Sequence, residues 1–184
     1  MMAYVSEISH AVGGCVPNTI VDIAKIDNTV PLKAYGKIGR DGEGAFLVKT
    51  LNDNGVNTDG IVNSDNLSTS FTDVMNVSST GERTFFQCPG ACADFGIDDI
   101  DINSLNCDIF HAGYILLLDK FDELDADYGT VMAKLLAKVQ EKGIKTSIDV
   151  VSEEGERFSK LVPPALKYCN YSIINEIEGG RAVG

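Results

Sequence analysis

Two glycine-rich stretches early in the chain have the composition of a binding floor for a small polar molecule. They are Gly13-Gly14-Cys15-Val16-Pro17-Asn18 and Gly36-Lys37-Ile38-Gly39-Arg40-Asp41-Gly42-Glu43-Gly44. Glycine lets the backbone turn sharply and come close to a ligand, and free N–H groups at the start of a helix bind hydroxylated or anionic groups. The candidate ligand-binding positions are turn glycines and two polar side chains, namely Gly13, Gly14, Asn18, Gly39 and Asp41.

Both stretches also have a purely structural interpretation, as ordinary turns from a strand into a helix. Pro17 suits the first turn of a helix, and Asn18 can cap its free N–H groups. Residues Leu32–Ile38 have the pattern of a buried strand, after which Asp41 begins a helix that stops at Asn54-Gly55. We therefore expect Asp41 to be a helix cap first and a substrate ligand second.

A β-hairpin is predicted in the middle of the chain. Ser68–Ser78 and Arg83–Cys88 are β-rich, and Ser79-Thr80-Gly81-Glu82 joins them with a turn signal. Its alternation of polar and apolar residues suits a lid with one covered face. Arg83 could reach an acidic or phosphorylated substrate from such a lid, or it could be a solvated charge at a sheet edge.

The apolar side chains of this hairpin predict self-association. Phe71, Met75, Phe85 and Phe86 are expected to form an uncovered apolar face, and such faces tend to pair with another copy of the same chain. The sequence therefore predicts a homodimer through the lid.

From Asp108 onward, strands and helices alternate, which predicts parallel strands with helices on both faces. His111 lies inside the first of these strands and is expected to be a core histidine, whereas Asp149 stands at a carboxyl edge, where open α/β sheets place ligands. The predicted elements are a strand at Asp108–Ala112, a helix after Asp125 that stops at Gly143, a strand at Ile144–Val150, a short helix interrupted by Pro163-Pro164, and a strand at Tyr171–Ile174.

Composition limits the classes of partner. The 184 residues suit one α/β domain, with 44% hydrophobic and 23% charged residues. A formal net charge of −12 opposes binding to nucleic acid or to anionic membranes. No apolar run approaches the length of a membrane span.

The five cysteines are scattered along the chain, which suits reduced thiols in the cytoplasm. The one close pair, Cys88 and Cys92, lacks the spacing of a zinc site. No direct metal ligand is therefore predicted.

The motifs, taken in order, resemble the ribokinase-like (PfkB) family of sugar kinases. GG-x-x-x-N followed by G-x-x-G-x-D-x-x-G resembles its first signature, Gly81–Ala91 looks like its lid, and Asn175-Glu176-Ile177-Glu178 fits its N-x-x-E motif. The resemblance implies a single ribokinase-like three-layer α/β domain over residues 1–184, with a mostly parallel sheet, helices on both faces, and a β lid from about residues 61–90.

The same resemblance implies roles for individual residues. Asn175 and Glu178 position phosphates and metal in a reaction that uses ATP as co-substrate with Mg²⁺, and the substrate is a sugar or sugar acid. The implied substrate-binding residues are Gly13, Gly14, Asn18, Gly39, Asp41 and Arg83. The best ligand pocket is expected between Gly13–Asn18, Gly36–Asp41 and the hairpin Thr69–Cys88.

Other parts of the family pattern are not found in this sequence. No G-A-G-D motif follows the N-x-x-E motif, and the family's opening strand with its sugar-binding aspartate is not recognisable before Gly13. We therefore expect a domain incomplete at both ends, with no catalytic residue assigned, exposed apolar surface near Tyr171–Ile174, and no kinase activity of the chain alone.

Two alternatives remain open, a non-catalytic sugar-binding or dimerisation remnant, and a nucleoside kinase of the same family. Other enzyme classes are excluded by their motifs. A dinucleotide fingerprint, a P-loop and a serine-hydrolase elbow are all missing from the sequence.

Overall fold

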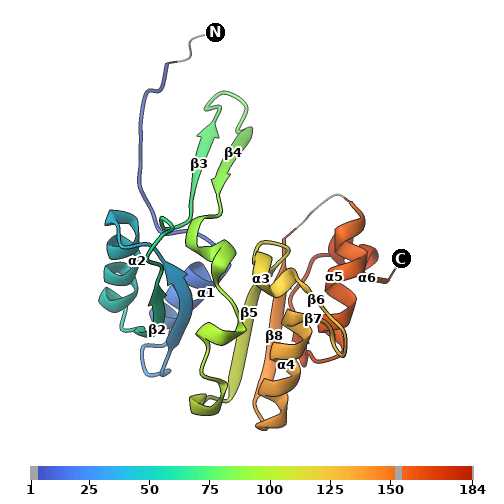
Figure 1. Ribbon diagram of the computed structural model, residues 1–184. Coiled ribbons are helices and arrows are strands. Elements are labelled where there is room, and N and C mark those ends of the chain that lie inside the picture. Colours follow the sequence, from blue (N-terminus) through green and yellow to red (C-terminus); the bar gives the residue numbers. More distant parts are fainter. Residues whose placement is uncertain (1–3, 152–154, 184) are drawn as a thin grey trace.

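The computed structural model describes residues 4–151 and 155–183 (Figure 1). In these ranges, β1 (Lys33–Ile38) pairs in parallel with β2 (Asn57–Asn63). A second parallel sheet has the order β5-β8-β9, formed by β5 (Ile109–Ile115), β8 (Lys145–Val150) and β9 (Tyr171–Ser172). The predicted parallel strands are therefore present, but within the described ranges β1 and β5 are not paired, so the sheet consists of two pieces.

Helices cover these two sheets (Figure 1). Two helices pack against the first sheet, namely α1 (Cys15–Ile26) and α2 (Gly42–Asp53). The second half contains the short α3 (Asp119–Asp122), then α4 (Val131–Glu141), α5 (Glu156–Leu166) and α6 (Glu176–Val183). Three short 3₁₀ helices at Gly90–Asp94, Ile97–Asp99 and Ile102–Ser104 connect the hairpin to β5 in the described chain.

The start of α4 differs from the sequence prediction. Leu124–Asp125 (β6) and Gly129–Thr130 (β7) form a small antiparallel pair. The helix begins only at Val131, because the Thr130 hydroxyl accepts a hydrogen bond from the Ala133 N–H at 3.1 Å and caps it. The helix predicted to begin after Asp125 is therefore wrong in its first turn.

The path of α5 is a second correction. The pair Pro163-Pro164 was expected to interrupt the helix, yet the helix continues through both prolines to Leu166. Each proline removes one backbone donor, but the buried side chains at helical spacing, Phe158, Leu161, Val162 and Ala165, pack into the core. Packing of one face therefore outweighs the lost hydrogen bonds, as is usual for helices in proteins.

Two clusters of buried side chains make up the core of the described residues. The larger lies around β5, β8, α4 and α5 and includes Phe121, Leu136, Ile148 and Phe158. The smaller lies around α1, β1 and α2 and consists of Ala24, Ala34, Leu51 and Val56. Helix α1 contacts both β1 and β5, so its position links the two halves of the fold.

The hairpin of β3 (Phe71–Asn76) and β4 (Arg83–Cys88) is antiparallel, as predicted, and extends away from the sheets (Figure 1). Residues that pair directly across two strands lie on the same face of the hairpin, and successive residues of one strand lie on opposite faces. The register therefore places Phe71, Met75 and Phe86 on one face, while Phe85 pairs with Val74 on the other. The expected single face is wrong for Phe85.

Apolar side chains at the edge formed by β9 are exposed, as expected from the sequence. Tyr171 is 45% and Ile173 67% exposed. None of the helices in the described part of the chain is long and apolar enough to span a bilayer.

Candidate functional site

The first glycine-rich stretch forms the turn into α1. Gly14 has φ +92° and stands at the N-cap position, a left-handed conformation that favours glycine. The helix starts at Cys15, so Asn18 lies inside it, and the Asn18 N–H donates to the Gly14 carbonyl at 3.2 Å. The predicted capping role of Asn18 is therefore wrong, and its side chain is exposed beside the exposed Gly13.

The second stretch forms a hydrogen-bonded network with the base of the hairpin. Asp41 Oδ1 accepts from the Gly44 N–H at 2.9 Å and from the Thr69 hydroxyl at 2.6 Å, and Asp41 Oδ2 accepts from the Thr69 N–H at 2.7 Å. The Thr69 hydroxyl in turn accepts from the Gly39 N–H at 2.9 Å. Asp41 is thus the cap of α2, as predicted.

Hydrogen bonding sets the charge state of Asp41. The bonds from the Thr69 hydroxyl, and then those from backbone N–H groups, lower the pKa of Asp41 below its ordinary value. A carboxylate offers about four acceptor positions, and Gly44 and Thr69 use three of them. The ionised, half-exposed side chain therefore keeps room for one ligand hydroxyl.

A cavity of about 470 Å³ opens beside this network. It is lined by the end of β1, the start of α2 and parts of β2, including Gly39, Arg40, Asp41 and Asn63. It is a depression largely open to solvent, with a volume within the range of small-molecule sites. Neither Gly13–Asn18 nor the strands of the hairpin line it. The expected pocket between all three segments is therefore wrong for these two segments, and only Gly36–Asp41 contributes to it.

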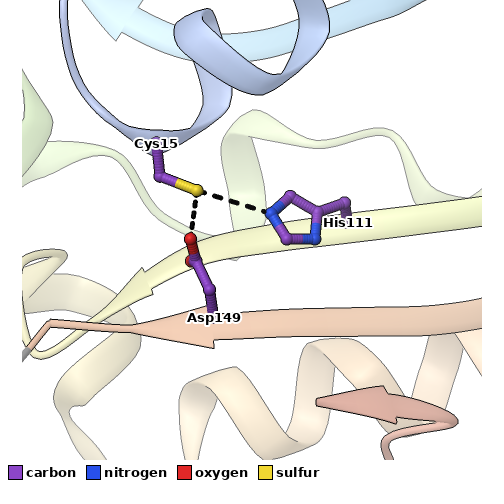
Figure 2. A group of neighbouring side chains, drawn as sticks. All are labelled: Cys15, His111 and Asp149. Atoms are coloured by element: carbon purple, nitrogen blue, oxygen red, sulfur yellow. Dashed lines mark hydrogen bonds between the residues drawn. The ribbon is translucent and has the colours of Figure 1, made fainter. Parts of the chain in front are cut away.

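A second polar group lies under the start of α1, where Cys15, His111 and Asp149 point toward one another (Figure 2). The Cys15 thiol hydrogen-bonds to Asp149 Oδ2, and its Sγ lies 3.6 Å from His111 Nε2. On the other side of the ring, His111 Nδ1 lies 3.1 Å from the Ser147 hydroxyl. Strand pairing explains this arrangement, because His111 of β5 and Ser147 of β8 are direct partners.

Burial controls protonation in this group. It raises the pKa of Cys15 to about 12, with the Asp149 hydrogen bond and charge adding to the effect. Burial also raises the pKa of Asp149 and lowers the pKa of His111, against the attraction of the Asp149 charge. Cys15 is thus a thiol at neutral pH and a poor nucleophile.

The N-x-x-E residues form a capping box at the start of α6. Asn175 Oδ1 accepts from the N–H groups of Ile177 at 3.0 Å and Glu178 at 2.9 Å, and Glu178 Oε2 accepts from the Asn175 N–H at 3.0 Å. The negative charge of Glu178 contributes to the raised pKa of Asp149. Burial is the main cause of that shift, and the charge of Glu178 is the smallest of the causes.

Arg83 is placed differently from the other predicted residues. It is the first residue of β4, next to the hairpin turn, and its guanidinium lies 5.6 Å from the centre of the Phe85 ring. Gly39 and Asp41 are hydrogen-bonded to Thr69, which precedes the Phe71–Cys88 pair at the end of the hairpin away from the turn. The structure thus does not bring Arg83 to the other predicted ligand-binding residues.

Sequence reasoning missed the convergence of Cys15, His111 and Asp149. Each was noticed separately, in a glycine turn, in a strand and at a strand end, but 96 and 134 residues separate Cys15 from its two partners. The available signal was topological, since a turn into a helix and the carboxyl ends of parallel strands meet at one sheet edge.

Two of three comparisons with known proteins find the same family. The sequence model for pfkB family carbohydrate kinases matches residues 1–184, whereas the comparison with curated proteins finds no match. Fructokinase from Xylella fastidiosa with bound ATP is similar in structure, with 25% identity, a TM-score of 0.69, and coverage of 87% of this chain and 50% of that one.

Two ribokinase structures show the same fold. The ribokinase of Arabidopsis thaliana in complex with ribose and ATP has 21% identity and a TM-score of 0.69, over 92% of this chain and 50% of that one. The ribokinase of Thermotoga maritima has 19% identity and a TM-score of 0.75, over 97% and 52%. The chain therefore has the ribokinase-like α/β fold that the sequence predicts, and it spans about half the length of these structures.

Proposed function

The chain belongs to the pfkB family of carbohydrate kinases, and from this premise we propose that it supplies the sugar-binding half of an ATP-dependent kinase. The proposed reaction transfers the γ-phosphate of ATP to a hydroxyl group of a sugar or sugar acid. The observation that carries this proposal is the family match over residues 1–184. The bound ATP of the similar fructokinase and the ribose and ATP of the similar ribokinase support it.

The network around Asp41 gives this chain a way to hold the acceptor. Asp41 is fixed by Gly44 and Thr69, and its remaining acceptor position suits a sugar hydroxyl. A charged acceptor makes a stronger hydrogen bond than a neutral one. The backbone at Gly39 and the adjoining cavity would accept the body of the sugar.

Asn175 and Glu178 are the residues of this chain that would help position Mg²⁺ and the phosphates of ATP. Their amide and carboxylate oxygens are of the kind that Mg²⁺ takes, and they lie at the start of α6 beside the acidic Asp149. The ion would neutralise charge on the phosphates of ATP. Asn175 and Glu178 hold each other in place through the capping box, so their oxygens are fixed before any ligand arrives.

We also propose that the 184-residue chain alone does not catalyse the kinase reaction. Its sequence contains no G-x-G-D stretch after Glu178, the motif that supplies the base and anion-binding groups in the resembling family. Loss of a positioned general base costs about 10² to 10⁴ in rate, and loss of an oxyanion donor costs roughly another 10² to 10³.

We further propose a cytoplasmic location, since the five cysteines are free thiols, as is usual in a reducing compartment.

A coupled ADP-release assay tests this function. It compares the 184-residue chain with any longer reading frame that contains it, on hexoses, pentoses, sugar acids and nucleosides. We expect turnover of one sugar or sugar acid by the longer protein and none by the short chain. Turnover by the short chain that Glu178→Ala abolishes would contradict the proposed inactivity, and exclusive use of a nucleoside would favour the nucleoside-kinase alternative.

Self-association through the hairpin is a separate proposal. Phe71, Met75 and Phe86 share one face of the hairpin and are 47%, 48% and 59% exposed. Exposed large apolar side chains gathered in this way mark an interaction site, and the charged Asp73, which pairs with Phe86, lies on the same face. We propose that it pairs with the same face of a second copy, which a two-fold axis would make self-complementary.

A further inference from the structure

Cys15, His111 and Asp149 form a group to which the kinase function proposed above assigns no direct role, since it involves Asp149 only as an acidic neighbour of Glu178. The three side chains come from the first turn of α1, from β5 and from the carboxyl end of β8 (Figure 2). One possible ligand atom of each lies within 4.8 Å of the other two. We propose that these residues bind one zinc ion through Cys15 Sγ, His111 Nε2 and a carboxylate oxygen of Asp149.

The separation of sulfur and nitrogen fits this coordination. With Zn–S near 2.3 Å and Zn–N near 2.0–2.1 Å in tetrahedral geometry, the two ligand atoms lie about 3.5 Å apart. The separation of Cys15 Sγ and His111 Nε2 is 3.6 Å. Cys15 Sγ and Asp149 Oδ2 are in direct hydrogen-bond contact, closer than two ligands of one zinc ion, so the ion would move these two side chains apart. The thiol would release its proton to solvent on binding, because cysteine coordinates as the thiolate.

The histidine is oriented for metal binding by its neighbour. His111 Nδ1 lies 3.1 Å from the hydroxyl of the buried Ser147. In the tautomer with hydrogen on Nδ1, the ring donates to Ser147, and the lone pair of Nε2 faces Cys15. Metal-binding histidines almost always use their second nitrogen in this way.

An independent observation concerns Asp149. Its Oδ1 atom is buried and, among the residues described, has no hydrogen-bond partner. Buried polar atoms are nearly always paired, so an unpaired carboxylate oxygen beside a thiol and an imidazole points to a missing ligand. Gly113 adjoins it, where a Cβ would overlap Asp149 Oδ1 and lie 3.2 Å from Cys15 Sγ. The glycine therefore leaves the site free of another side chain.

The ligand types select the metal. A thiolate and an imidazole suit zinc and other borderline transition metals, whereas Mg²⁺ and Ca²⁺ prefer oxygen ligands alone. Three protein ligands leave a fourth position for water or a small molecule. Because α1 belongs to the smaller core cluster, and β5 and β8 to the larger, the ion would fasten the two halves of the fold together.

Cobalt(II), a spectroscopic substitute for zinc, provides the test. The purified 184-residue chain is freed of metal with a chelator and titrated with Co²⁺. We expect one Co²⁺ per chain, a thiolate-to-cobalt charge-transfer absorption, and displacement by one equivalent of Zn²⁺. Cys15→Ser should abolish the absorption, and Cys107→Ser, at an exposed cysteine outside the group, should preserve it. Ser147→Ala should keep the absorption but weaken binding about 10- to 100-fold.

Other results would overturn the proposal. The first is that the wild-type chain shows no charge-transfer absorption. The second is that the absorption remains in Cys15→Ser but is lost in Cys88→Ser. If Cys15→Ser does not fold, zinc X-ray absorption of the wild-type chain decides, since one sulfur with at least one imidazole nitrogen supports the site and any other sulfur count contradicts it. These readouts do not depend on kinase activity, so their failure would leave the proposed function unaffected.

Discussion

The carboxylate of Asp41 accepts a 2.6 Å hydrogen bond from the hydroxyl of Thr69, 28 residues further along the chain. This contact joins the first turn of α2 to the base of the β3–β4 hairpin. It also holds one of the predicted substrate-binding residues in a fixed position. The lid and the floor of the proposed sugar site are therefore connected through the Asp41 carboxylate, and also through the Gly39 N–H, which donates to the Thr69 hydroxyl.

Replacing this carboxylate should destabilise the protein. Asp41→Ala removes a helix cap, which costs about 1 kcal/mol, and hydrogen bonds to a charged group, which contribute about 1.5–3 kcal/mol. Because these effects overlap, we expect a loss of about 1–3 kcal/mol in urea denaturation. Asp65→Ala is the control, since Asp65 forms an exposed ion pair with Arg40 and should change stability by less than about 1 kcal/mol. Equal effects of the two substitutions would contradict the role of Asp41.

The same carboxylate should make stability depend on pH. The pKa of Asp41 is below its ordinary value of 3.8, so its stabilising effect is complete above that value and is lost as the pH falls through the lowered pKa. The stability difference between wild type and Asp41→Asn should therefore be largest near neutral pH and shrink in acid. A difference that stays constant down to pH 2 would show that the charge of Asp41 does not contribute.

Two glycines of α2 should respond oppositely to alanine. A Cβ at Gly44 would lie 2.6 Å from the Gly39 carbonyl oxygen and 2.9 Å from the Thr69 hydroxyl oxygen. Overpacking of this kind costs about 1–3 kcal/mol, more than the gain of up to about 1 kcal/mol in helix propensity. At Gly42 a Cβ meets nothing within 4 Å. Thermal denaturation should show a lower Tm for Gly44→Ala and an unchanged or higher Tm for Gly42→Ala, and the reverse order would contradict this packing.

The hairpin register provides a matched test of self-association. Phe86→Glu puts a charge on the face shared with Phe71 and Met75, whereas Phe85→Glu puts one on the opposite face. Light scattering at high protein concentration should give a dimer for the wild type and Phe85→Glu, and a monomer for Phe86→Glu. A monomeric wild type, or equal behaviour of the two variants, would contradict pairing through this face.

Local signals predicted many of the regular elements. The cap at Asp41 and the stop near Asn54 correctly predicted α2, and the turn residues between β3 and β4 predicted the hairpin. These features depend on neighbouring residues, which a sequence displays directly. The apolar stripe after Val131 likewise predicted the body of α4.

Features that depend on distant contacts were less predictable. Strand β2 has little apolar alternation and forms because its backbone pairs with β1. The prolines of α5 were misinterpreted because burial of Phe158 and Val162 outweighs local preference. The group around Cys15 depends on the register of β5 against β8, which is not visible in the sequence.

Sugar binding by the 184-residue chain is the most direct test of its proposed role as the sugar-binding half of a kinase. The measurement is a titration, followed by ligand-detected NMR, with hexoses, pentoses, sugar acids and nucleosides. We predict saturable binding of at least one sugar or sugar acid, weakened about 10-fold by Asp41→Asn and unchanged by Asp53→Asn, which alters an exposed acid that pairs with Lys49 and does not line the cavity. The lack of binding to every sugar and sugar acid, or equal binding by the two variants, would contradict the account.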